Sequence, residues 1–87
     1  MEAWKIIVNP KAGNGRAEKA LTKLSSAFSE SGIDYDLSLS TRNGHAFELS
    51  RDAVLEGYRK ILSVGGDGTN NEVLNGFFQQ KIVDVEE

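Results

Sequence analysis

A short glycine-rich segment that follows an apolar stretch is the part of the sequence best suited to phosphate chemistry. It has the sequence GGDGT at residues 65–69. Glycine lets the backbone take positive φ angles and approach a ligand closely, and a helix N-terminus after it binds anions, phosphate above all. Asp67 would repel a phosphate unless a Mg²⁺ ion lies between them or a hydroxyl group is to be deprotonated. The alternative is a plain strand–turn–helix connection with Asp67 or Asn70 as the N-cap.

A second loop, at residues 9–15, contains two glycines and is followed by Arg16. Lys11 and Arg16 would supply positive charge to a phosphate, although each is also explained as an ordinary solvated surface charge. The loop lacks the Gly-Lys-Ser/Thr of a Walker A motif, and Glu18 stands where the pattern G-x-G-x-x-G needs its third glycine. This loop alone is therefore a weak indication of nucleotide binding.

Two more candidate side chains follow an alternating stretch in the middle of the chain. The Thr41 hydroxyl suits a nucleotide phosphate, and it suits equally an N-cap of the next helix. His45 is the single histidine of the sequence and falls in the first turn of that helix. For His45 a structural role is favoured over a catalytic one.

The apolar pattern predicts the elements that must position these residues. Short β-branched or alternating stretches predict three strands, at residues 3–8, 33–40 and 60–64. Helical periodicity predicts helices at residues 16–31, from 46 to near 57, and from 71 to about 78. Gly32 and Gly57 stand where helices end, and residues 79–87 show only a weak alternation.

This alternation of strands and helices predicts a three-layer, Rossmann-like α/β fold with a parallel sheet. The strictly alternating second strand has one polar face and is expected at an edge, which gives the strand order 2-1-3. The helices after the first and third strands then leave toward opposite faces of the sheet. Open α/β sheets bind ligands at such a switch point, and both glycine-rich loops and Thr41 would lie there.

Composition narrows the functional classes further. The 87 residues form one small domain, with 10 Lys and Arg against 13 Asp and Glu and a net charge of −3, which argues against a basic nucleic-acid surface. The absence of cysteine excludes a disulfide scaffold, a thiolate zinc site and a cysteine nucleophile. No apolar run reaches the roughly 18 residues of a membrane span, and the start does not resemble a signal peptide. We therefore expect a cytoplasmic protein.

The longer motifs resemble the catalytic domain of diacylglycerol kinases, which bacterial lipid kinases and sphingosine kinases share. They are NPKAG at residues 9–13, Thr41 with GHA at 44–46, and GGDGTNNEVLNG at 65–76. The GGDGT core also occurs in NAD kinases and, more loosely, in phosphofructokinases, whereas EVLNG and Asn9-Pro10 favour lipid kinases. Ala12 departs from the serine that many relatives carry, which removes one hydroxyl contact.

This resemblance implies transfer of the ATP γ-phosphate to a lipid hydroxyl with the help of Mg²⁺. Asp67 would be the catalytic residue, as a metal ligand or as the acceptor of the hydroxyl proton. The residues that would bind the nucleotide and its phosphates are Asn9, Pro10, Lys11, Ala12, Gly13, Thr41, Gly65, Gly66, Asp67, Gly68, Thr69, Asn70 and Asn71.

The resemblance also implies that residues 1–87 are the N-terminal part of a kinase, because the family's domain continues with another phosphate loop and a β-rich lipid-binding domain. We therefore expect the isolated chain to be inactive and to self-associate weakly through the open edge of its third strand. The parent enzyme would contact a membrane peripherally through the remaining part. Two other hypotheses stay open: an NAD-kinase-type enzyme, and a non-catalytic nucleotide-binding module.

Overall fold

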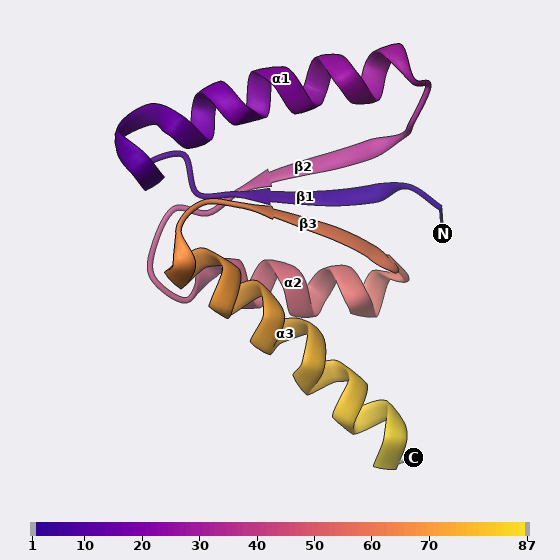
Figure 1. Cartoon of the computed structure of the whole chain (residues 1–87). Helices are drawn as coiled ribbons and strands as arrows, with labels where there is room; N and C mark the ends of the chain where they lie inside the picture. The colour runs from indigo at the N-terminus through magenta and orange to yellow at the C-terminus, as the bar shows by residue number, and fades with distance from the viewer. Residues whose placement is uncertain (1, 87) are drawn as a thin grey trace.

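The computed structural model describes the backbone of residues 2–86 and the side chains of residues 2–78. Helix α1 covers one face of a small sheet, and helices α2 and α3 cover the other (Figure 1). The predicted three-layer arrangement is thus confirmed. The elements in chain order are β1 (Trp4–Val8), the 3₁₀ turn η1 (Ala12–Gly15), α1 (Arg16–Glu30), β2 (Tyr35–Leu39), α2 (His45–Glu56), β3 (Lys60–Val64) and α3 (Asp67–Glu86).

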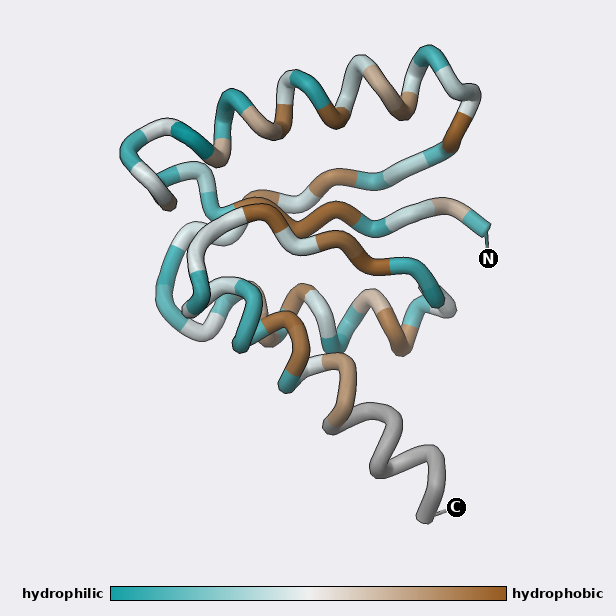
Figure 2. The backbone as a smooth tube through the Cα atoms, in the orientation of Figure 1, coloured by the Kyte–Doolittle hydropathy of each residue, from teal (hydrophilic) through white to brown (hydrophobic). Residues whose placement is uncertain are grey.

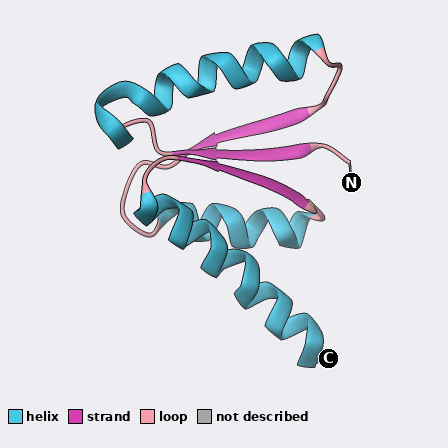
Figure 3. Ribbon diagram, viewed as in Figure 1, coloured by secondary structure: helices cyan, strands magenta, loops and turns pink. Residues whose placement is uncertain are grey.

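The sheet is parallel and has the predicted order β2-β1-β3. Val8, the last residue of β1, lies in register with Leu39 of β2 and Val64 of β3. The three strands therefore end together, and the loops that follow them meet at one edge of the sheet (Figure 3).

The central strand supplies the core on both faces, as its nearly continuous apolar sequence indicates. Ile6, Ile7 and Val8 are 0% exposed. Ile6 and Val8 pack toward α1, and Ile7 packs with Ala46 and Val73 on the opposite face. The apolar residues accordingly line the sheet and the helix faces turned toward it (Figure 2).

The two crossover helices end with the same glycine motif at the amino edge of the sheet. After α1, Gly32 has φ 68° and the Ile33 N–H donates to the Phe28 carbonyl at 2.9 Å. After α2, Gly57 has φ 104° and the Tyr58 N–H donates to the Ala53 carbonyl at 3.0 Å. A residue without Cβ takes this conformation without steric cost, so both predicted helix ends are confirmed.

Helix α3 differs from its prediction at both ends. It begins at Asp67, not at residue 71, because the Asn70 N–H donates to the Gly66 carbonyl at 3.1 Å and closes the first helical turn there. It continues to Glu86, so the weak alternation over residues 79–87 does not produce a strand within the described part. Glutamine, lysine and glutamate in this stretch favour a helix.

The edge strands are less buried than the central strand. Leu39 is 46% exposed although the alternation places it with Tyr35 and Leu37, because an edge strand has a neighbour on one side only. Among the described residues no strand lies beside the outer edge of β3. The expected self-association through that edge stays a prediction.

No helix in the described residues combines the length and apolar character needed to cross a bilayer.

Candidate functional site

The loop after β1 has an unusual backbone at the carboxyl edge of the sheet. The Asn9 side chain accepts a hydrogen bond from the Lys11 N–H at 3.2 Å, which turns the chain away from the strand. Gly13, Asn14 and Gly15 then follow with φ angles of 65°, 53° and 92°. Such left-handed conformations suit glycine and, among other residues, asparagine. The backbone conformation therefore explains why glycine occupies both positions in this loop.

The connection from β3 to α3 is shorter than the sequence suggests. Only Gly65 and Gly66 lie between the strand and the helix. Gly65, Gly66 and Gly68 all stay outside the left-handed region, so the expectation of positive φ angles here is wrong. The chain turns by entering the helix directly. A Cβ added to Gly66 or to Gly68 would have no atom within 4 Å, so the helix N-terminus is uncovered on that side.

Gly65 is required by close packing. A Cβ at this position would lie 2.7 Å from Oγ1 and 2.8 Å from Cβ of Thr69, which is itself 6% exposed. Gly65 therefore allows Thr69 to pack under the loop.

We expect Gly65→Ala to destabilise the chain by about 1–3 kcal/mol, as overpacking does elsewhere, because Thr69 must move. Urea unfolding followed by circular dichroism measures the change. Gly66→Ala is the matched control and should leave the midpoint nearly unchanged, since nothing surrounds its Cβ position. Equal midpoints for the two variants would contradict the packing role of Gly65.

The side chains of Asp67 and Asn70, both in the first turn of α3, have different surroundings. Asp67 is exposed, and in the described part of the chain no side chain pairs with its carboxylate. Asn70 instead uses its side-chain oxygen to accept a hydrogen bond of 2.6 Å from the Ser63 hydroxyl on β3. Asp67 is thus free to meet a ligand, whereas the Asn70 side chain fixes the helix to the sheet.

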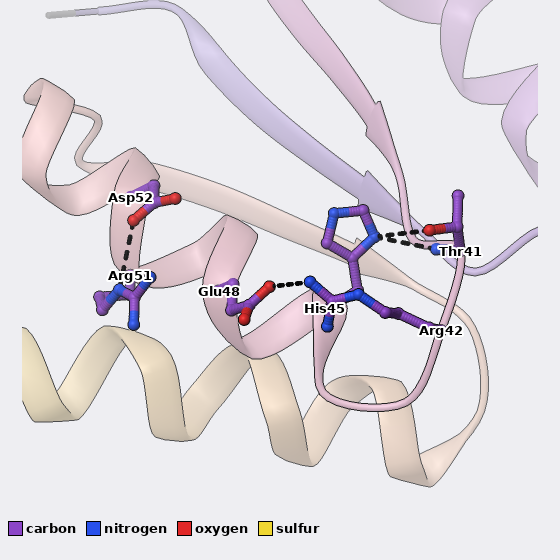
Figure 4. A network of polar contacts seen from close by, with 6 residues as sticks. All are labelled: Thr41, Arg42, His45, Glu48, Arg51 and Asp52. Carbon is purple, nitrogen blue, oxygen red and sulfur yellow. Dashed lines mark hydrogen bonds and ion pairs between the residues drawn. The ribbon is translucent and has the colours of Figure 1, made fainter.

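The loop after β2 is held by side chains of α2 (Figure 4). The Thr41 N–H donates to Nδ1 of His45 at 2.9 Å, and the Thr41 hydroxyl lies 3.3 Å from the same atom. Arg42 forms an ion pair with Glu48. Helix α2 has Gly44 as its N-cap, so the alternative of Thr41 as the N-cap is wrong. His45 is the first residue of the helix and therefore lies in its first turn, as predicted.

Eight of the thirteen candidate residues line two hollows at this edge. The first is a polar cleft of about 230 Å³. Its lining residues are Asn9, Lys11, Ser40, Thr41, Arg42, Asn43, Ala46, Thr69 and Glu72. The second hollow measures about 330 Å³ and lies against α1. Its lining residues are Ala12, Gly13, Arg16, Ala17, Ala20, Val64, Gly65 and Gly66.

The structure therefore divides the predicted set. Asn9, Lys11, Thr41 and Thr69 share the polar cleft, while Ala12, Gly13, Gly65 and Gly66 share the other hollow. Asn70 lines a third groove, beside β3. Neither hollow includes Pro10, Asp67, Gly68 or Asn71 in its lining.

Five residues that line the polar cleft were missing from the predicted set: Ser40, Arg42, Asn43, Ala46 and Glu72. Arg42 and Asn43 line the polar cleft, and their place directly after Thr41 at a strand end was the available indication. The positive groups of the cleft are Lys11 and Arg42, but Arg42 is already paired with Glu48.

The donor set for a metal is small. Within residues 2–78 no three His, Cys, Asp or Glu side chains are grouped so as to hold a metal ion. Mg²⁺ commonly uses one or two carboxylates together with substrate phosphates and water. The exposed carboxylate of Asp67 fits such a shared site, and it does not fit a site made by protein ligands alone.

Comparison with known proteins identifies the family of this chain. Residues 3–85 match the family model of the diacylglycerol kinase catalytic domain. The chain is 34% identical over 76 residues to a diacylglycerol kinase of Bacillus subtilis and 32% identical over 80 residues to a ceramide kinase of Arabidopsis thaliana. A crystal structure of a diacylglycerol kinase from Bacillus anthracis superposes with a TM-score of 0.68 at 34% identity over 86% of this chain.

The matches cover most of this chain and a minor part of each relative. They include 87% of this chain and 25% of the B. subtilis kinase, 88% and 13% for the ceramide kinase, and 27% of the B. anthracis structure. The resemblance predicted from the loop motifs is confirmed, since the family model extends over nearly all of the sequence. The chain belongs to the diacylglycerol kinase catalytic domain family.

Proposed function

We propose that this chain is the N-terminal nucleotide-binding part of an ATP- and Mg²⁺-dependent lipid kinase. The observation that carries the proposal is the meeting of three strand ends at one edge, where the uncovered N-terminus of α3 and the polar cleft lie together. Backbone N–H groups at a helix N-terminus bind phosphate. The named relatives, a diacylglycerol kinase and a ceramide kinase, support a lipid acceptor.

Each part of the edge has a role in this proposal. Residues 9–13, Thr41 and residues 65–71 hold the nucleotide and its phosphates, and Lys11 adds positive charge. The lipid hydroxyl attacks the γ-phosphorus, the bond to the β-phosphate oxygen breaks, and ADP leaves. Asp67 accepts the hydroxyl proton or helps to hold Mg²⁺, which when bound neutralises charge on the phosphates.

Positioning and charge stabilisation supply most of the catalysis in phosphoryl transfer. The edge described here offers phosphate contacts and one carboxylate, while the lipid contacts would come from the rest of the kinase. We also propose that the kinase works in the cytoplasm. Because the proposed acceptor is a lipid, we expect peripheral contact with a membrane.

The acceptor test uses the full-length kinase with γ-labelled ATP and Mg²⁺. Diacylglycerol, a sphingoid base and ceramide are offered separately in detergent micelles, and NAD is offered in solution. We expect label in one lipid product and none in NAD, as thin-layer chromatography would show. Label in NAD alone would favour the NAD-kinase-type alternative, and label in none would favour a non-catalytic nucleotide-binding module.

A further inference from the structure

His45 contacts the polar cleft through its bond to Thr41. An amide N–H can only donate, so the Nδ1 atom that accepts it at 2.9 Å carries no proton. The proton of the neutral ring is therefore on Nε2. This assignment follows from the partner of the ring nitrogen and involves no ligand.

The same bond determines what the Thr41 hydroxyl can do. The backbone N–H occupies the Nδ1 lone pair at 2.9 Å, and the hydroxyl, at 3.3 Å, is the weaker competitor for it. The hydroxyl proton is thus available to an acceptor in the cleft, whose lining Thr41 shares with Lys11 and Thr69.

Backbone hydrogen bonds hold the loop on either side of Thr41, whereas the N–H of Thr41 itself bonds to the His45 side chain. The Ser40 N–H donates to the Val8 carbonyl at 2.8 Å, and the His45 N–H donates to the Arg42 carbonyl at 3.1 Å. Among the described residues, His45 is the one hydrogen-bond acceptor for the Thr41 N–H. The hydrogen bond that holds the Thr41 backbone in place therefore comes from His45.

We propose that His45 is a positioning residue whose unprotonated Nδ1 holds Thr41 with its hydroxyl toward a nucleotide phosphate. Protonation of the ring places an N–H on Nδ1 opposite the Thr41 N–H, and two donors cannot bond, so Thr41 is released. This inference rests on the proposed nucleotide site. Nucleotide binding then weakens in acid.

The sign of the pH dependence of nucleotide binding distinguishes two possible roles of His45. Arg42 and Glu48 are paired with each other, while Lys11 from the β1 loop and Glu72 from α3 line the cleft. If the ring instead contacted phosphate directly, its positive form would strengthen binding in acid. The positioning role and a direct contact therefore predict opposite pH dependences.

The test compares Mg-ATP binding by the full-length kinase and two variants at pH 8 and pH 5.5. His45→Asn keeps an acceptor, because its Oδ1 takes the place of Nδ1, and it cannot be protonated in this range. His45→Ala removes the acceptor. We expect the wild-type Kd to be higher at pH 5.5 than at pH 8, by at most about 10-fold, the effect of one lost hydrogen bond. His45→Ala should bind about 5- to 10-fold more weakly than wild type at pH 8.

His45→Asn should bind within about twofold of wild type at pH 8 and should lose the additional acid dependence. Titration of ATP itself affects all three proteins equally, so the comparison is between variants. Thermal melting confirms that each is folded. Equal binding by His45→Ala and wild type, or His45→Asn behaving like His45→Ala, would overturn the positioning role of His45 but not the proposed function. A wild-type kinase that binds no Mg-ATP at either pH would overturn the proposed function and this inference with it.

Discussion

Asp67→Asn in the full-length kinase lowers the rate of phosphoryl transfer to lipid by about 10²- to 10⁴-fold, the usual contribution of a positioned general base. The carboxylate is exposed in the first turn of α3, and within the described part of the chain no side chain competes for it. The substitution keeps the size of the side chain and removes its charge. Turnover is measured from labelled lipid phosphate at saturating ATP.

Stability should hardly change in this variant. An exposed acidic residue in the first helical turn contributes about 0.3–1 kcal/mol to the free energy of unfolding. Asp34→Asn is a matched control, because Asp34 is also exposed but precedes β2 at the opposite edge of the sheet. Full activity in Asp67→Asn, or an equal loss in Asp34→Asn, would refute the assigned role.

Gly76→Ala destabilises the chain strongly although it lies in the same motif as Asp67. A Cβ there would lie 2.4 Å from the Phe47 carbonyl oxygen and 3.1 Å from the Arg51 nitrogen, both backbone atoms of α2. Backbone atoms cannot move away as the end of a flexible side chain can, so α2 and α3 must separate. We expect a loss of about 3 kcal/mol, the upper part of the range for overpacked cores, measured by urea unfolding.

Gly68→Ala makes the same chemical change in the same helix. Nothing lies within 4 Å of its Cβ position, so we expect no loss and a gain of up to about 1 kcal/mol from helix propensity. A smaller loss in Gly76→Ala than in Gly68→Ala would show that α2 and α3 do not pack as described.

The architecture was predictable because the strands carry distinct patterns. The continuous apolar run of β1 indicates burial on both faces, and the alternation before Ser40 indicates an edge. Together they determine the order 2-1-3, and hence the edge where the site residues meet. The glycines at 32 and 57 locate two helix ends for a local steric reason.

The details of the site depend on tertiary contacts that no pattern shows. Glycines and asparagines at residues 66–71 have low helix propensity, yet the bond from Asn70 to Gly66 starts α3 early. Gly76 resembles any isolated helical glycine until the backbone of α2 is placed against it. The bond between Thr41 and His45 requires the folded loop, so neither residue type reveals it.

The close contact between α2 and α3 also bears on the entropy of binding. Helix α2 holds the Thr41 loop through His45, and α3 carries Thr69 and Glu72, which line the cleft. Ser50, fully buried on α2, donates to the Val73 carbonyl of α3 at 2.6 Å beside the Gly76 contact. Helices packed backbone to backbone move as one body, so these two walls of the cleft are preorganised. If the cleft binds a nucleotide as we propose, binding would order little further chain, and more of the contact free energy would remain as affinity.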